Sequence, residues 1–75
     1  MLKIDQNGDR RWYNKKNQLH REDGPAYECV DGKKCWFING KRHREDGPAF
    51  EGLNGFREWN WNGKEYTEKA YKEKV

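Results

Sequence analysis

The stretch His20-Arg21-Glu22-Asp23-Gly24-Pro25-Ala26 decides the fold, because the same seven residues return at positions 43–49, an offset of 23. A tryptophan follows each copy at the same spacing, Trp36 and Trp59, and an Asn-Gly-Lys turn sequence comes after each tryptophan. A sequence that resembles itself at a period of about 20 to 50 residues is typical of repeat architectures. We therefore expect a chain built of similar units.

Composition limits the size of the hydrophobic core. The chain has 75 residues, of which 32% are hydrophobic and 39% are charged, so we expect one thin-cored domain over residues 1–75. The 4 Trp, 4 Tyr and 3 Phe favour a folded chain, since each aromatic ring buries a large area. The 16 basic and 13 acidic residues are interspersed, with a net charge of +3, which argues against a nucleic-acid partner.

Secretion and membrane insertion are not expected. The residues at 1–5 lack the apolar stretch of a signal peptide, and no apolar run approaches the ~20 residues needed to span a bilayer. We therefore predict a cytoplasmic protein without a membrane span.

Turn signals divide the chain into units at about residues 3–20, 26–43 and 49–66, followed by a C-terminal cap at 67–75. Asn-Gly and Asp-Gly pairs between hydrophobic residues predict hairpins with two-residue turns. The first unit has one additional residue, which we place in the polar loop at 14–18. In the cap, Thr67 is the expected N-cap of a short helix that packs Tyr71 and Val75 on the sheet.

A two-residue turn at Asp31-Gly32 would fix the register of the middle hairpin. It places Tyr27 opposite Trp36, in one row with His43. The same construction gives a second row of Phe50, Trp59 and Tyr66.

The same register points the thiols of Cys29 and Cys35 to opposite faces of the sheet, because side chains alternate along a strand, and no disulfide is expected. Between units, the Arg-Glu-Asp-Gly-Pro segments predict kinks. Proline lacks an amide hydrogen, glycine permits φ > 0, and aspartate can bond backbone amides two residues on.

These signals predict an all-β fold, an antiparallel meander of β-hairpins with a short C-terminal helical cap. Aromatic pairs on one face would hold the sheet together, because cross-strand rings stabilise a sheet that has few other apolar residues. The residues with an expected structural role in the repeated unit are His20, Asp23, Gly24, Pro25, Tyr27, Trp36, His43, Asp46, Gly47, Pro48, Phe50 and Trp59.

The pattern Trp-x-x-Asn-Gly-Lys-x-His-Arg-Glu-Asp-Gly-Pro-Ala resembles degenerate MORN-type repeats of the bacterial and phage form, over about residues 7–66. The resemblance implies a meander of β-hairpins, one per repeat, whose sheet contacts a protein or a membrane surface without catalysis. Small proteins built on this variant look like those of phages and mobile elements, which commonly bind and block a host protein.

Histidine, glutamate and aspartate occur together at positions 20–23 and again at 43–46, and these are residue types of metal sites and acid–base pairs. Consecutive turn side chains diverge, and equivalent residues two strands apart are about 9–10 Å from each other, too far to share one ion. We therefore expect no metal, no cofactor and no catalytic residue. A metal-dependent nuclease that uses these residues is kept as an alternative.

A second alternative is the binding of single-stranded nucleic acid, with bases stacked on the tryptophans beside basic residues. A thin-cored chain needs those rings for its own packing, so this alternative is less favoured. Trp61 is the exception, because it takes the position held by Ile38 in the preceding unit, next to a tight turn. We predict that Trp61, Arg57, Lys41 and Arg42 contact a partner.

The sequence therefore predicts a small non-enzymatic protein-binding module of the bacterial cytoplasm. The expected partner is a host protein, which the chain would inhibit as a phage or mobile-element product. The unpaired sheet edges also permit a homodimer, since an added strand satisfies free backbone groups.

Overall fold

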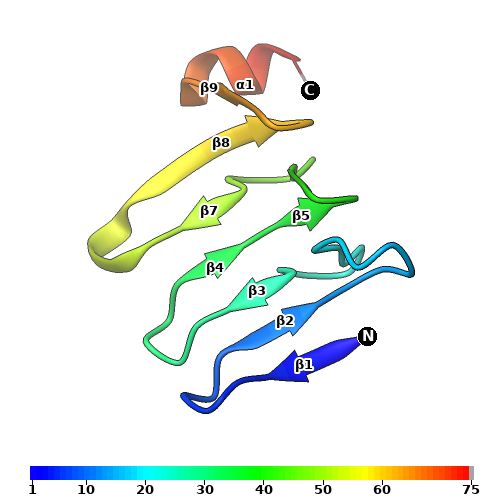
Figure 1. Cartoon of the computed structure of the whole chain (residues 1–75). Coiled ribbons are helices and arrows are strands. Elements are labelled where there is room, and N and C mark those ends of the chain that lie inside the picture. Colours follow the sequence, from blue (N-terminus) through cyan, green and yellow to red (C-terminus); the bar gives the residue numbers. More distant parts are fainter. Residues whose placement is uncertain (75) are drawn as a thin grey trace.

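The computed structural model describes residues 1–74 as an antiparallel sheet with a short helix at its C-terminal end (Figure 1). This confirms the expected sheet and helix. The elements are β1 (Leu2–Ile4), β2 (Arg10–Trp12), β3 (Tyr27–Glu28), β4 (Lys34–Cys35), β5 (Phe37–Ile38), β6 (Lys41–Arg42), β7 (Phe50–Glu51), the 3-10 turn η1 (Leu53–Gly55), β8 (Arg57–Trp61), β9 (Lys64–Tyr66) and α1 (Glu68–Lys74). The sheet order is β1-β2-β3-β4-β7-β8-β9, and β5 and β6 form a separate pair.

The molecule is a single layer of strands with dimensions of 38 × 30 × 17 Å, and α1 lies at one end of it (Figure 1). A single layer leaves few side chains without water contact. The buried apolar residues are Ala26, Cys35, Ala49 and Tyr71. Rings and long side chains that cover one another on the sheet surface must therefore supply most of the remaining packing.

The β3–β4 hairpin turns over three residues, 30–32, and its last residue is a glycine with a φ of 105°. The amide of Cys29 donates to the carbonyl of Lys33 at 2.8 Å, which closes this longer turn. The predicted two-residue turn is therefore wrong. The register is displaced by one residue, so that Tyr27 lies opposite Cys35 and not opposite Trp36.

The displaced register also changes the placement of the cysteines. Cys35 lies opposite Tyr27, and Cys29 lies two residues from Tyr27 along the same chain segment, so both thiols are on one face of the sheet. The prediction of opposite faces is wrong for the same reason as the turn. Both cysteines are free.

The turns at Asn39-Gly40 and Asn62-Gly63 have two residues, as predicted. Both asparagines have a φ of 49°, and the glycines have φ of 82° and 86°, which are the values of a type I′ turn. The pairs that these turns align are as expected, including Trp59 opposite Tyr66. The additional residue of the first unit lies in a polar turn at 15–17. The side-chain oxygen of Asn14 closes this turn by accepting hydrogen bonds from the amides of Lys16 and Gln18.

The two faces of the sheet carry different aromatic residues. Alternation along the strands puts Trp12, Trp36 and Trp59 on one face, which we call the tryptophan face, and Tyr27 and Phe50 on the other. The predicted rows that join Tyr27 to Trp36 and Phe50 to Trp59 are therefore wrong. A displacement of one residue moves a side chain to the opposite face.

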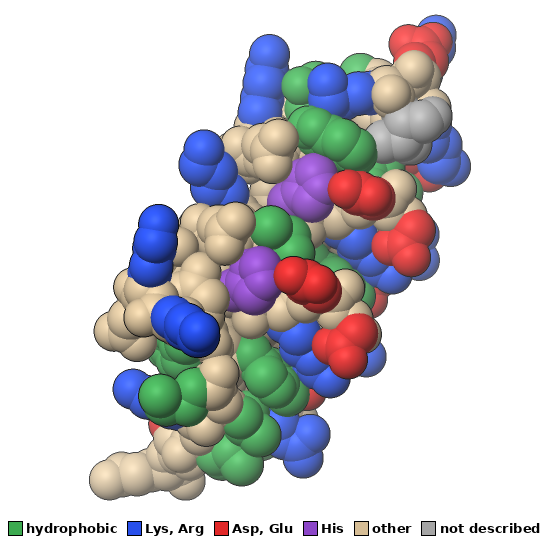
Figure 2. Space-filling model, turned by 90° about the vertical axis from the view of Figure 1, so that its right-hand side faces the viewer, with side chains coloured by type: hydrophobic (Ala, Val, Ile, Leu, Met, Phe, Trp, Pro, Cys, Tyr) green, Lys and Arg blue, Asp and Glu red, His purple; other side chains and the backbone are tan. Residues whose placement is uncertain are grey.

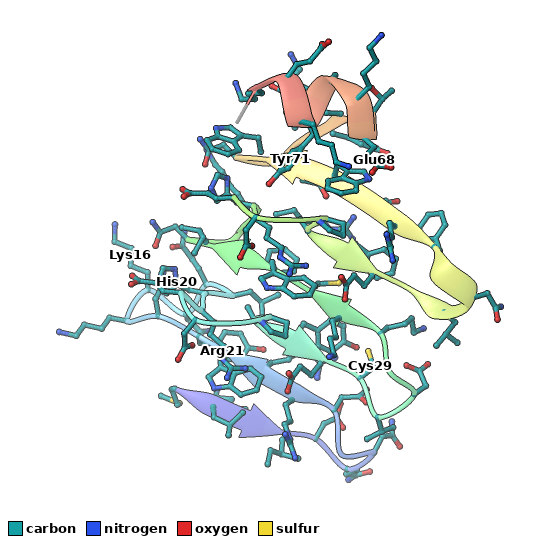
Figure 3. The ribbon with its side chains drawn as sticks, turned by 180° about the vertical axis from the view of Figure 1, so that it is seen from behind. Lys16, His20, Arg21, Cys29, Glu68 and Tyr71 are labelled. Carbon is teal, nitrogen blue, oxygen red and sulfur yellow. The ribbon has the colours of Figure 1, made fainter. Side chains whose placement is uncertain are left out.

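The helix α1 closes the C-terminal end of the tryptophan face. Thr67 caps it as predicted, since its hydroxyl accepts a hydrogen bond from the amide of Ala70 at 3.1 Å. Tyr71 points from the helix onto the sheet (Figure 3), with its ring centroid 5.1 Å from that of Trp59 and its hydroxyl donating to the carbonyl of Arg44. Val75, which was expected to pack beside it, lies outside the described residues.

Candidate interaction surface

Two arginines fold back from the linking loops over tryptophan rings. The guanidinium of Arg21 lies 3.9 Å from the ring centroid of Trp12, and that of Arg44 lies 3.8 Å from the ring centroid of Trp36. In both loops, Nε donates to the aspartate two residues on, and Nη1 donates to the proline carbonyl four residues on. The loops at 21–25 and 44–48 therefore have the same internal contacts, with the arginine at their centre.

The arginines explain the glycines of these loops, for a reason other than the predicted one. Neither Gly24 nor Gly47 is among the positive-φ glycines of residues 1–74. A Cβ atom would lie 3.2 Å from Cζ of Arg21 at the first position and 2.8 Å from Cζ of Arg44 at the second. Glycine therefore lets the guanidinium lie against the loop, where a larger residue would displace it. The aspartates, expected to bond backbone amides, accept from the arginine side chains instead.

The histidines of both loops hold the neighbouring tight turn. Nδ1 of His20 accepts a hydrogen bond from the amide of Asn39, and Nδ1 of His43 accepts one from the amide of Asn62, both at 3.0 Å. A backbone amide is always a donor, so Nδ1 carries a lone pair and the proton of the neutral ring is on Nε2. Nε2 of His43 can then donate to Glu45, 3.3 Å away, and Nε2 of His20 lies 3.4 Å from the carboxylate of Glu22.

We expect nitrogen NMR to show the Nε2–H tautomer for His43. We also expect His43→Ala to lower the free energy of unfolding by about 2 kcal/mol, because the amide of Asn62 loses its acceptor. His43→Asn is the matched control: its side-chain oxygen can accept from the same amide, so it should lose about half as much. An Nδ1–H tautomer, or equal losses in the two variants, would contradict this geometry.

A groove of about 910 Å³ lies between the two loops. Its lining includes the half-buried rings of Trp36 and Trp61, together with Ile38 and Pro25. The ring of Trp61 packs edge-on against that of His43, with 4.5 Å between their centroids. The groove therefore presents apolar side chains whose positions are held by the structural contacts of the loops.

Four carboxylates border this groove, and their side chains are 83%, 87%, 75% and 87% exposed. Each contacts its own loop through one oxygen, to the histidine or to the arginine, which leaves the second oxygen for a partner. Figure 2 shows acidic side chains to the right of the two histidines, with basic side chains on both sides of them. The four residues, which we call the rim carboxylates, are Glu22, Asp23, Glu45 and Asp46.

The predicted contact residues lie in different places. Trp61 lines the groove, and Lys41 is exposed on the tight turn that precedes the second loop. Arg42 lies on the face opposite the tryptophans, where it pairs with Glu58 at 2.7 Å. Arg57 begins β8, about 13 Å along the strand from Trp61. Trp61 alone of the four therefore lines the groove.

Sequence reasoning did not identify the rim carboxylates as contact residues. It assigned the aspartates a structural role and considered the glutamates only as metal or acid–base groups. The Arg-Glu-Asp run does not show which side chain folds inward, and the glycine that follows it is the one local sign that a side chain lies against the loop.

The other face of the sheet holds a tyrosine with a perturbed pKa, whose neighbour Cys29 lies at the end of the strands opposite His20 (Figure 3). The pKa of Tyr27 is raised from 10.0 to about 12, first by its hydrogen bond with the Cys29 thiol group and second by burial. Arg11 donates to the same hydroxyl at 3.1 Å and opposes this shift.

We expect Cys29→Ala to lower the pKa of Tyr27 toward its ordinary value, because the main cause of the shift is removed. The folded-state pKa is above the unfolded one, so the stability that Tyr27 contributes is complete below pH 10.0 and is lost as the pH rises through about 12. Ring carbon shifts in an NMR titration would follow Tyr27 separately from the other tyrosines. An unchanged titration in Cys29→Ala would refute the assigned cause.

Comparisons with known proteins give no identification. A scan against protein-family models, a search of curated proteins and a search of solved structures each found no match to this chain. The MORN-type resemblance therefore stays a prediction from the sequence. Within residues 1–74, no group of three or more His, Cys, Asp or Glu side chains is placed to hold a metal ion. No helix in the same part of the chain is long and apolar enough to cross a membrane.

Proposed function

We propose that this chain is a small non-enzymatic protein-binding module that receives its partner in the groove between the two loops. The proposal rests on one observation: within each loop, some side chains stabilise the fold and others remain accessible to a partner. The arginine and histidine hold the fold, whereas the exposed rim carboxylates and the half-buried ring of Trp61 line the groove. Apolar rings beside accessible polar groups are the usual composition of a protein-binding site.

Two observations, the covered tryptophan rings and the acidic rim, favour a protein over single-stranded nucleic acid. Base stacking requires accessible ring faces, and the rings of Trp12, Trp36 and Trp59 are covered by Arg21, Arg44 and Tyr71. The rim carboxylates would also repel a phosphate backbone. The nuclease alternative is disfavoured by the histidines, because Nδ1 of each ring is occupied by a backbone amide and Nε2 by a carboxylate of its own loop.

The cellular setting of the proposal comes from the sequence resemblance. We place the module in the bacterial cytoplasm, as a phage or mobile-element product that inhibits a host protein. A module that blocks a host surface needs no catalytic residue. This agrees with the histidines, whose ring nitrogens contact groups of the fold itself.

Affinity capture from bacterial lysate, followed by mass spectrometry, tests this function. The wild-type chain should retain a specific protein that Trp61→Ala no longer retains, since a central aromatic anchor commonly contributes about 2 kcal/mol or more to binding. Phe56→Ala is the control, because Phe56 is 53% exposed but lies outside the groove. Circular dichroism would verify that both variants are folded. Equal retention by all three chains, or retained nucleic acid in place of protein, would reject the proposal.

A further inference from the structure

We infer, building on the proposed function, that the groove binds an extended basic segment of the partner in the polyproline II conformation, with Arg or Lys at every third residue. Three observations combine to define this ligand: the distance between equivalent positions of the two loops, the charge of the rim, and the apolar lining.

The spacing of the loops selects the backbone conformation. The loops at 21–25 and 44–48 lead into β3 and β7, which are separated by β4 in the sheet. Two strand spacings place equivalent loop positions about 9–10 Å apart. A polyproline II helix rises about 3.1 Å per residue with three residues per turn, so its side chains at i and i+3 point the same way about 9.3 Å apart.

Other regular conformations match this distance less well. Side chains on one side of a β-strand repeat at two residues, or roughly 6.6 Å, and the next repeat is about 13 Å. One turn of an α-helix advances about 5.4 Å, and two turns about 10.8 Å. A polyproline II segment is therefore the regular backbone that offers one equivalent side chain to each loop.

The rim carboxylates select the side chains. Each loop presents one glutamate and one aspartate, with one oxygen of each committed inside the loop and the second available. Two carboxylates in one loop can receive a guanidinium or an ammonium through charge-assisted hydrogen bonds. Because the two loops have the same internal contacts, each should accept the same kind of side chain.

The lining of the groove suits the residues between the basic positions. Trp61, Ile38 and Pro25 are apolar and border the same hollow as the rim carboxylates. Proline-rich segments bind in aromatic-lined grooves because their conformation is already extended before binding, so that little entropy is lost. The ligand class that joins these features is a basic, proline-rich peptide segment.

Synthetic peptides test the spacing directly. One peptide consists of four Arg-Pro-Pro triplets, and the control has the same composition with its arginines in adjacent pairs separated by four prolines. Titrations followed by tryptophan fluorescence and by amide NMR shifts should show binding of the triplet peptide that is about tenfold tighter than binding of the paired control. A Glu-Pro-Pro peptide should show no binding.

Variants of the chain test the contacts. Glu22→Gln and Glu45→Gln remove one rim charge each and keep an oxygen that can accept from the histidine, and each should weaken the triplet peptide about tenfold. Glu73→Gln is the matched control, because Glu73 is an exposed carboxylate on α1 outside the groove, and it should leave binding unchanged.

The outcomes separate this inference from the proposed function. Equal affinity for the two arginine spacings, or no binding of either at about 1 mM, overturns the inference. If a lysate protein is nevertheless captured and lost in Trp61→Ala, the protein-binding function stands with a ligand of different chemistry. If the triplet peptide binds and both rim variants bind it normally, the groove is the wrong site and the inference falls.

Discussion

Replacement of Tyr71 by alanine should leave the chain close to its unfolding midpoint at room temperature. Tyr71 is the largest fully buried side chain, 2% exposed, and its ring lies 5.1 Å from that of Trp59 and 6.3 Å from that of Trp61. Truncation of a buried aromatic residue commonly costs about 3–5 kcal/mol. Domains have about 5–15 kcal/mol of stability in total, and a thin 75-residue chain should lie near the lower end of that range.

Urea unfolding followed by tryptophan fluorescence and circular dichroism would measure this effect. Tyr71→Phe is the control, because it keeps the ring and removes only the hydroxyl that donates to the carbonyl of Arg44, for a loss of about 1 kcal/mol. If Tyr71→Ala unfolds at the same urea concentration as the wild type, α1 is not part of the cooperative unit.

The second large effect is expected at Arg44. Its guanidinium covers Trp36, donates to Asp46 and to the carbonyl of Pro48, and lies 3.3 Å from Glu51, with the side chain only 21% exposed. Arg44→Ala removes all of these contacts and leaves a buried loop carbonyl without its donor, so we expect a loss of about 3 kcal/mol.

Arg44→Lys should lose about 2 kcal/mol although it keeps the charge, because an ammonium cannot reproduce the planar fork of donors or its stacking on the indole. Lys72→Ala is the control: Lys72 also lies over a tryptophan, 5.7 Å from the ring of Trp59, but it is 63% exposed. That variant should change stability by less than about 0.5 kcal/mol in the same urea experiment. Stabilities that are equal in Arg44→Lys and the wild type would show that charge alone matters at this position.

Features fixed by local chemistry were predictable from the sequence. The Asn-Gly pairs at 39–40 and 62–63 form type I′ turns of the predicted length. The pairs at 7–8 and 54–55 were expected to do the same, but they lie in three-residue turns at 6–8 and 53–55, so the predicted turn length is wrong for them. The hydroxyl of Thr67 accepts a hydrogen bond from the amide of Ala70 in the first turn of α1. Because threonine is a common N-cap residue, the start of the helix could be predicted from the sequence.

The register of the middle hairpin was not predictable in the same way. Asp-Gly is compatible with a two-residue turn and with a three-residue turn that ends in glycine. In the structure, the Asp9 side chain accepts from the amide of Val30, the first residue of the longer turn. A contact between residues 21 positions apart cannot be predicted from a local sequence pattern. The resulting error of one residue in the predicted register placed Tyr27 opposite Trp36, whereas it lies opposite Cys35.

The candidate site was predictable only in part. Trp61 stood out because it replaces a smaller residue beside a turn, and it lines the groove. The rim carboxylates and the stacked arginines could not be separated from one another in the sequence, because an Arg-Glu-Asp run does not say which side chain folds inward. Packing against the tryptophans decides that question, and the glycine that makes room for the guanidinium is the only local trace of it.

The contacts of the loops recur at an offset of 23 residues, and Tyr71 covers Trp59 in the way that arginines cover Trp12 and Trp36. A chain built in this way could be lengthened by the insertion of a further unit. A second copy of residues 43–65 inserted after Glu65 should set a new arginine over Trp59 and move Tyr71 onto the added tryptophan. The groove would then be about 9–10 Å longer. The number of repeated units would therefore set the length of the peptide segment that the groove can bind.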